Sequence, residues 1–231
     1  MSDARLMELL DSGTRRLVRS VDAMSDEQWA QPSLLPGWSR AHVVAHLTLN
    51  AEGLSGAVEG VHEGRPVPMY ASQEARDGDI AALATSRPGE LRDRFLASTT
   101  VIGEWVEELA ENLEGTPIER TPGGRQFPAG EVGNMRVREV EIHHADLGLD
   151  YTAADWSSEF VALLLDWASR RPAGPPAFTA HATDLDRSWT FGSGGPVVSG
   201  VGSALAWWVT GRGTGDGLTS DDGRVPRMEP W

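Results

Sequence analysis

Three residues that can bind a metal ion occur close together in one short segment. Glu139 and His143 are four positions apart, and Asp146 follows three positions later. In an α-helix these steps place side chains on one face. A carboxylate and an imidazole that converge on one face are ligands that a divalent metal such as zinc binds. The spacing therefore makes this segment a candidate metal site.

A solvent-exposed charged helix face is the alternative interpretation of the same spacing. Charged neighbours in the segment favour that alternative: Arg136, Arg138 and Glu141. Apolar neighbours favour an inward-facing stripe instead: Val132, Met135 and Leu147. The metal site also needs a third ligand from another part of the chain. His144 falls on a different face of the helix and is expected to be structural.

His46 is the main candidate for the third ligand. It lies on the apolar face of another predicted helix, where an imidazole costs free energy unless it has a partner. A core histidine with one hydrogen bond is the alternative, and His42, four residues earlier, could form a ligand pair with His46. His42 is the weaker candidate because it lies in the first helical turn. Two histidines and Glu139 would leave an open coordination position, as catalytic zinc sites do, with Asp146 orienting a ligand.

Arg76 and Arg212 are the best candidates for binding an anion, and Arg125 is a third. The alternative for each is an exposed salt bridge, which is common for arginine. Arg212 stands between two glycines, where the backbone can turn tightly and a ligand can approach. The glycine-rich segment around it lacks the lysine of a phosphate-binding P-loop, so we reject that interpretation.

The composition limits the partners of the protein. The 231 residues include 20 Lys and Arg against 34 Asp and Glu, which gives a net charge of −14. Such a charge opposes nucleic acid and anionic membranes, and an anionic substrate would need a local group of arginines. The chain has no cysteine, which excludes disulfides and a cysteine nucleophile. No apolar run has the length of a signal peptide core or a membrane span, so a cytoplasmic protein is expected.

Two domains must position these residues. Helical periodicity predicts four long helices in residues 1–150 and a short helix between the second and third of them. The long helices cover about 3–24, 39–61, 88–109 and 130–147, and the short one covers 73–83. The pattern of residues 151–231 predicts a small α+β domain. Its helices are expected at 156–170 and 203–209 and its strands at 177–182, 187–191 and 195–200.

Several segments resemble a known family, the mycothiol-dependent maleylpyruvate isomerases of the DinB-like superfamily. Residues 35–47 read LPGWSRAHVVAHL and are similar to the first metal-ligand motif of that family, and residues 135–143 read MRVREVEIH and are similar to the second. Residues 68–76, PMYASQEAR, and the Gly-Arg-Gly of residues 211–213 resemble the isomerase more narrowly. The resemblance covers nearly the whole chain. Glu141 and His144 depart from it, since more apolar or variable residues are expected there.

The resemblance implies a mainly α fold with an α+β part, a DinB-like four-helix bundle followed by a small C-terminal α+β domain. Carried over by position, it implies that Zn²⁺ or another divalent metal is bound by His46, Glu139 and His143. It also implies that Arg76 and Arg212 are functional arginines, with Arg212 also near the cofactor, and that Asp146 supports the metal. Mycothiol and a small dicarboxylate are the expected partners, and a monomer is compatible with the sequence.

The activity implied by the resemblance is cis–trans isomerisation of 3-maleylpyruvate to 3-fumarylpyruvate in gentisate breakdown. A thiolate that adds to the cis double bond makes it single, rotation follows, and thiolate expulsion leaves the trans bond. A chain without cysteine needs an external thiol for this chemistry, and mycothiol meets that need. A thiol transferase acting on another electrophile and a non-catalytic metal- or ligand-binding module are the two alternatives.

Overall fold

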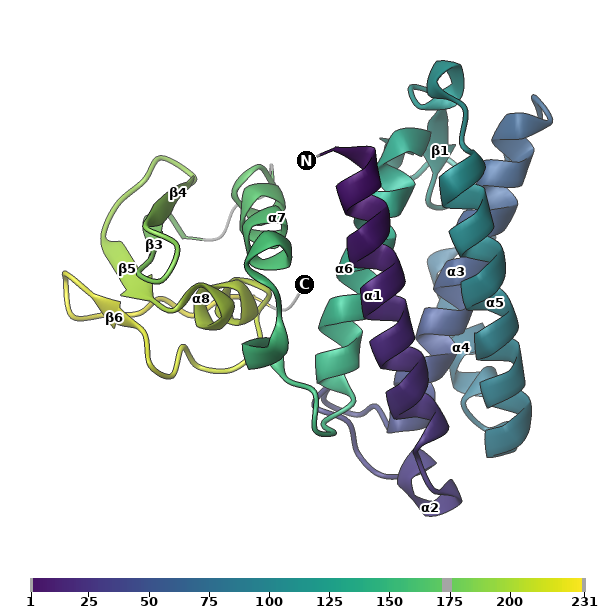
Figure 1. Cartoon of the computed structure of the whole chain (residues 1–231), viewed down its shortest axis with the longest axis horizontal. Coiled ribbons are helices and arrows are strands. Elements are labelled where there is room, and N and C mark those ends of the chain that lie inside the picture. The colour runs from purple at the N-terminus through teal and green to yellow at the C-terminus, as the bar shows by residue number, and fades with distance from the viewer. Residues whose placement is uncertain (1, 172–175, 230–231) are drawn as a thin grey trace. The chain divides into compact units, whose positions relative to one another are not determined.

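Four long helices form the first of two units into which the chain divides, Met1–Leu149 and Asp150–Trp231. They are α1 (Asp3–Asp22), α3 (Arg40–His62), α5 (Pro88–Glu108) and α6 (Val132–Asp146). In the computed structural model, which describes residues 2–171 and 176–229, these helices run side by side as a bundle (Figure 1). The predicted mainly α fold with a smaller α+β part is confirmed.

Several helices of the first unit begin at residues that suit a helix N-terminus. The Ser39 side chain accepts a hydrogen bond from the backbone N–H of His42 at the start of α3. Ser72 does the same for Ala75 at the start of α4 (Gln73–Leu83), and Ser25 forms a capping box before α2 (Asp26–Trp29). Pro88 occupies the first turn of α5, where its missing N–H costs nothing. These local signals explain why the predicted starts of α3, α4 and α5 are confirmed.

A short hairpin, which the sequence analysis did not predict, connects α5 to α6. Its strands are β1 (Pro117–Glu119) and β2 (Gln126–Pro128), which pair antiparallel. Short 3₁₀ helices flank it at Glu111–Leu113 and Ala129–Glu131. Strands of three residues are too short to show the alternation that identifies a strand in sequence. The hairpin matters for the site because Met69 and Tyr70 hydrogen-bond to the end of β1.

The second unit is built on a four-stranded sheet with the strand order β4-β3-β5-β6. The strands are β3 (Phe178–Ala182), β4 (Arg187–Phe191), β5 (Val197–Gly200) and β6 (Thr219–Ser220). Strand β3 pairs parallel with β5, and the other pairs are antiparallel. The 3₁₀ helix Ala153–Asp155 and helices α7 (Ser158–Ser169) and α8 (Gly202–Val209) complete the unit. Its core contains stacked Phe178 and Phe191 rings with Trp208 against them.

In the described part of the chain, no helix is long and apolar enough to cross a membrane.

Candidate metal centre

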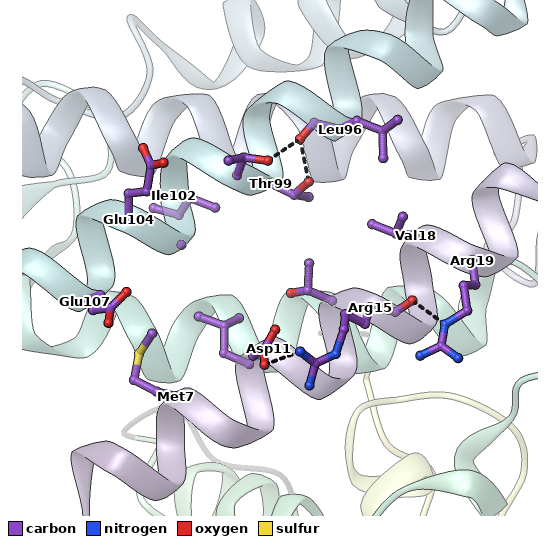
Figure 2. Close-up of a pocket in the computed structure, with 14 residues that line it drawn as sticks. Met7, Asp11, Arg15, Val18, Arg19, Leu96, Thr99, Ile102, Glu104 and Glu107 are labelled. Carbon is purple, nitrogen blue, oxygen red and sulfur yellow. Dashed lines mark hydrogen bonds and ion pairs between the residues drawn. The ribbon is translucent and has the colours of Figure 1, made fainter.

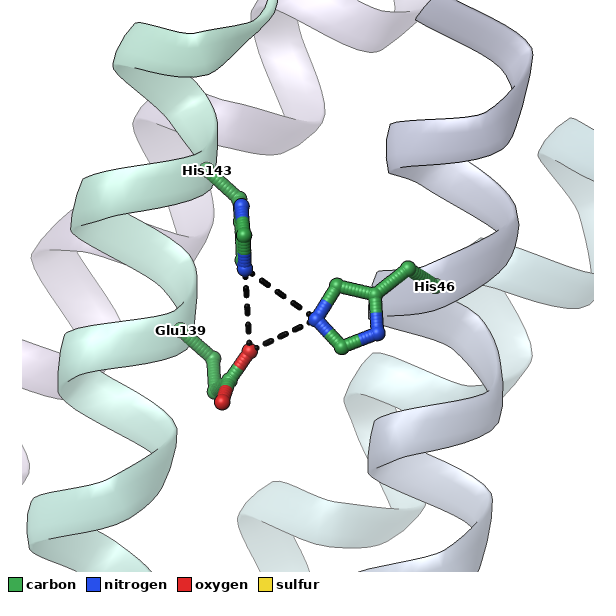
Figure 3. Close-up of side chains that lie close together, drawn as sticks. All are labelled: His46, Glu139 and His143. Carbon is green, nitrogen blue, oxygen red and sulfur yellow. Dashed lines mark hydrogen bonds and ion pairs between the residues drawn. The ribbon is translucent and has the colours of Figure 1, made fainter. Parts of the chain in front are cut away.

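Helices α3 and α6 bring His46, Glu139 and His143 together inside the bundle (Figure 3). Nε2 of His46 lies 2.8 Å from Oε2 of Glu139 and 3.1 Å from Nε2 of His143. Nε2 of His143 lies 3.2 Å from the same Glu139 oxygen. One atom from each side chain therefore forms a nearly regular triangle.

The size and chemistry of the triangle fit a divalent metal. Zinc bonds of about 2.0–2.1 Å at tetrahedral angles separate two ligand atoms by about 3.3 Å. The three distances of 2.8, 3.1 and 3.2 Å need to widen by only a few tenths of an ångström to reach that value. Two imidazole nitrogens and one carboxylate oxygen form a ligand set typical of catalytic zinc, with a fourth position left for another group.

Asp146 holds the ring of His143 in a fixed orientation. Its Oδ2 lies 2.8 Å from Nδ1 of His143, and the carboxylate is fully buried. A carboxylate can only accept, so Nδ1 carries the proton and donates it. This hydrogen bond leaves the lone pair of Nε2 directed at the other two candidate ligands. The geometry is that of a carboxylate that orients a metal-binding histidine.

Burial and mutual contact shift the pKa values of the three candidate ligands. Burial lowers the pKa of His46 to about 4, so this ring is neutral at physiological pH. Burial alone would raise the pKa of Glu139, but His46 and His143 together hold it well below its usual value. Burial opposes the charged form of His143 too, yet hydrogen bonds to Asp146 and Glu139 raise its pKa. A neutral imidazole and an ionised carboxylate are the forms that bind metal.

Arg76 extends from α4 to the same cluster. Its Nη2 lies 3.1 Å from Nδ1 of His46, and its Nη1 contacts Asp77 at 2.8 Å. Since arginine only donates, Nδ1 of His46 accepts here and the ring proton is on Nε2, facing Glu139. The structure thus brings Arg76 into contact with a candidate metal ligand.

Arg212 belongs to the second unit and is held there by its own neighbours. It is 8% exposed, and its Nη1 donates to the carbonyl oxygen of Thr210 at 3.0 Å. Its guanidinium carbon lies 5.8 Å from the ring centroid of Trp207. The flanking glycines, Gly211 and Gly213, have φ angles of 77° and 69°, which non-glycine residues rarely adopt. The expected tight turn is present.

Other residues considered from the sequence have structural partners instead. Nδ1 of His42 lies 2.7 Å from the hydroxyl of Ser39 and takes part in the cap of α3. Nε2 of His144 lies 2.7 Å from the hydroxyl of Ser20 on α1, as expected for a structural histidine. Arg125 is exposed in the hairpin loop.

The alternative of a solvent-exposed charged face is wrong, because α6 is buried on nearly all sides. Glu141 is 1% exposed and forms a 2.6 Å ion pair with Arg16 of α1. Arg136 is also 1% exposed, and its Nη1 donates at 3.0 Å both to the carbonyl of Leu47 and to the side chain of Asn50. These contacts place α1 and α3 on different sides of α6.

Arg136 and Tyr70 also lie near the cluster, although neither was predicted from the sequence to be part of the site. Arg136 precedes Glu139 by three positions and therefore shares its helix face, which is a signal that spacing alone could have provided. Tyr70 stands within the segment 68–76 that resembles the isomerases, but nothing in its spacing connects it with His46. Its place depends on the hairpin β1–β2.

A separate cavity of about 560 Å³ opens between α1 and α5 (Figure 2). Apolar side chains such as Met7, Val18 and Ile102 line it, and an ion pair between Asp11 and Arg15 lies at its edge. None of the predicted site residues lines this cavity. The residues that the sequence suggested for chemistry lie elsewhere, and three of them meet between α3 and α6.

Comparisons with known proteins identify the family of the chain. The family model described as mycothiol maleylpyruvate isomerase N-terminal domain matches residues 10–148. A crystal structure of the mycothiol-dependent maleylpyruvate isomerase is 29% identical, with a TM-score of 0.90 over 100% of this chain and 98% of that chain. A histidine-to-alanine variant of that isomerase is 28% identical, with the same TM-score and coverage. No curated protein sequence matches significantly. The chain therefore belongs to the mycothiol maleylpyruvate isomerase family and is an enzyme of the isomerase class.

Proposed function

We propose that this enzyme converts 3-maleylpyruvate to 3-fumarylpyruvate, a cis–trans isomerisation in gentisate breakdown, with zinc and mycothiol as cofactors. The observation that carries the proposal is the triangle of His46, Glu139 and His143, with both histidines buried, in a member of this family that has no cysteine. Zinc and mycothiol, when bound, would supply a metal-stabilised thiolate that adds to the cis double bond and later leaves it.

The residues of the chain prepare the site for this chemistry. Glu139 provides an ionised carboxylate, and His46 provides a ring that burial keeps neutral. Asp146 fixes the ring of His143 so that its Nε2 faces the metal position.

The arginines would bind the anionic substrate. A neutral His46 that coordinates through Nε2 carries its proton on Nδ1, so Arg76 would lose its present hydrogen bond and become available to a carboxylate. Arg212 would bind a second carboxylate or the thiol cofactor. Local positive charge is needed because the net charge of −14 opposes a dianion.

Replacing His46 by alanine tests the metal role. The His46→Ala variant should lose bound zinc and isomerase turnover together, because two ligands hold the ion poorly. The His42→Ala variant is the matched control, since His42 lies one helical turn away and outside the triangle. Full turnover by metal-free His46→Ala protein would contradict the proposed zinc site.

A further inference from the structure

Tyr70 lies beside the candidate metal ligands, in contact with two arginines. The guanidinium carbons of Arg76 and Arg120 are each 5.7 Å from the centroid of its ring. Arg76 also reaches Nδ1 of His46 at 3.1 Å. A single guanidinium group therefore connects the tyrosine with a candidate metal ligand, which places the phenol at the edge of the site.

The backbone around Tyr70 is fixed by the hairpin on one side and by α3 on the other. The N–H groups of Met69 and Tyr70 donate to the carbonyls of Glu119 and Arg120 at 3.0 and 3.1 Å. A Cβ atom at Gly53 of α3 would lie 2.9 Å from the carbonyl oxygen of Met69 and 3.4 Å from a ring carbon of Tyr70. Only glycine at this position lets the segment approach α3 so closely.

Buried hydrogen-bond donors without a partner lie around Tyr70. The hydroxyl oxygen of Tyr70 accepts a hydrogen bond from Arg76, because an arginine side chain can only donate, so the hydroxyl proton is left to be donated to another group. Nε of Arg76 and Nη2 of Arg136 are buried and have no partner in the part of the chain that the structure describes. Arg136 is 1% exposed and lies near Tyr70 and the ionised Glu139. Unsatisfied buried donors cost free energy, so a group of them favours an anionic ligand that can accept.

The hydroxyl of Tyr70 keeps its proton at physiological pH. Burial raises the pKa of Tyr70, and the charge of Glu139 raises it further. The charges of Arg76 and Arg120 act in the opposite direction without reversing the shift. Tyr70 is therefore a hydrogen-bond donor that the neighbouring guanidinium groups hold in place.

We propose that Tyr70 is a catalytic residue of the isomerisation, whose hydroxyl donates a hydrogen bond to the substrate oxygen on which negative charge develops. The proposal rests on the proposed function and assigns this role to a residue outside the predicted site. When the sulfur–carbon bond forms, the π pair of the carbon–carbon double bond moves onto the conjugated carbonyl oxygen. When that bond breaks, the pair returns, so the hydrogen bond strengthens and weakens with no net proton transfer.

Kinetics of the Tyr70→Phe variant test the role of the hydroxyl. The ring that contacts both guanidinium groups is retained, so only the hydroxyl is lost. We expect kcat to fall about 100- to 1000-fold, as for the removal of one oxyanion donor, with KM and zinc content little changed. Tyr151→Phe, the same change at the only other tyrosine, should leave kcat normal. A normal kcat in Tyr70→Phe, or a rise in KM alone, overturns the proposal.

A second measurement needs neither zinc nor turnover. The ultraviolet absorbance of tyrosinate is followed against pH in metal-free protein, with and without maleate as a dicarboxylate probe. A carboxylate that accepts from the hydroxyl should raise the pKa of Tyr70, and the shift should vanish in Tyr70→Phe and persist in Tyr151→Phe. If maleate causes no shift, the proposal fails.

The two measurements separate this inference from the proposed function. A wild-type protein that shows the maleate shift but does not isomerise maleylpyruvate contradicts the proposed function and leaves the anion contact of Tyr70 standing. An active wild type with an equally active Tyr70→Phe variant contradicts the role of Tyr70 alone.

Discussion

At the scale of single residues, the three candidate ligands differ in the protons that they carry before a metal binds. His46 is neutral above pH values of about 4, and Glu139 is ionised well below its usual range. His143 is the exception, because Asp146 and Glu139 raise its pKa. Below that raised pKa, His143 carries an additional proton, and a metal ion must displace this proton in order to bind.

The pH dependence of zinc affinity tests this difference. Below the raised pKa of His143, the association constant should fall about tenfold per pH unit, because one proton competes with the ion. The slope of the logarithm of the zinc association constant against pH should approach two only near pH 4, where His46 also becomes protonated. Competition with a chromophoric chelator at several pH values measures the slope.

The Asp146→Asn variant is the informative comparison, since it removes the charge that raises the pKa of His143. Its decline in zinc affinity should begin at lower pH, and its affinity at neutral pH should be about 10- to 100-fold weaker. Asp150→Asn, at an exposed position outside the cluster, should behave as the wild type. A slope of two throughout the range from pH 6 to 5 would contradict the different protonation of the two histidines.

Spacing in the sequence could identify the candidate ligands on one helix but not the contacts between helices. Their spacing in the sequence is enough to place three side chains on one helix face: Glu139, His143 and Asp146. The contact of Arg76 with His46 and the place of Tyr70 depend on the packing of segments far apart in the chain. A three-residue strand sets the position of Tyr70, and strands that short have no recognisable pattern.

At the scale of secondary structure, α6 shows how a charged helix becomes buried. Its partners are supplied by neighbouring helices: Arg16 pairs with Glu141, Ser20 contacts His144, and Leu47 and Asn50 accept from Arg136. The apolar stripe of α6 suggested one inward face, whereas the sides toward α1 and α3 are both covered. The sequence could not show this because each polar partner lies more than 80 positions away.

Gly13 of α1 makes the close approach of α1 to α6 possible. A Cβ atom there would lie 2.6 Å from Oε1 of Glu141 and 3.3 Å from Val140. Gly13→Ala should therefore destabilise the protein by about 1–3 kcal/mol through overpacking, although alanine has the better helix propensity by about 1 kcal/mol. Urea unfolding measures the change.

Gly103→Ala is the matched control for this substitution. Gly103 lies in α5, and a Cβ atom there would meet nothing within 4 Å. This variant should be as stable as the wild type or slightly more stable, because it gains helix propensity without a clash. If Gly13→Ala were equally stable, the close packing of α1 on α6 would not have the importance assigned to it.

At the scale of the whole molecule, the candidate metal ligands and Arg212 lie in different units. His46, Glu139 and His143 all belong to Met1–Leu149, and Arg212 belongs to Asp150–Trp231. The change from long helical periodicity to short alternating runs allowed the sequence to indicate an α+β part after residue 150. Strand β6 was missed because it has two residues.

This separation predicts that the loss of the Arg212 side chain affects turnover but not metal binding. The Arg212→Ala variant should retain the full zinc content, because all three ligands are elsewhere, while its turnover falls sharply for want of a substrate-binding cation. Elemental analysis and steady-state kinetics on the same preparation measure both quantities. Normal kinetics would make Arg212 a structural residue of its own unit, held by Thr210 and Trp207.

The most direct test of the proposed function is a spectroscopic isomerisation assay with maleylpyruvate on protein of measured zinc content, with and without mycothiol. We expect fumarylpyruvate to form only when zinc and mycothiol are both present, because the chain has no thiol of its own. Isomerisation without mycothiol, or none with both cofactors present, would contradict the proposed function.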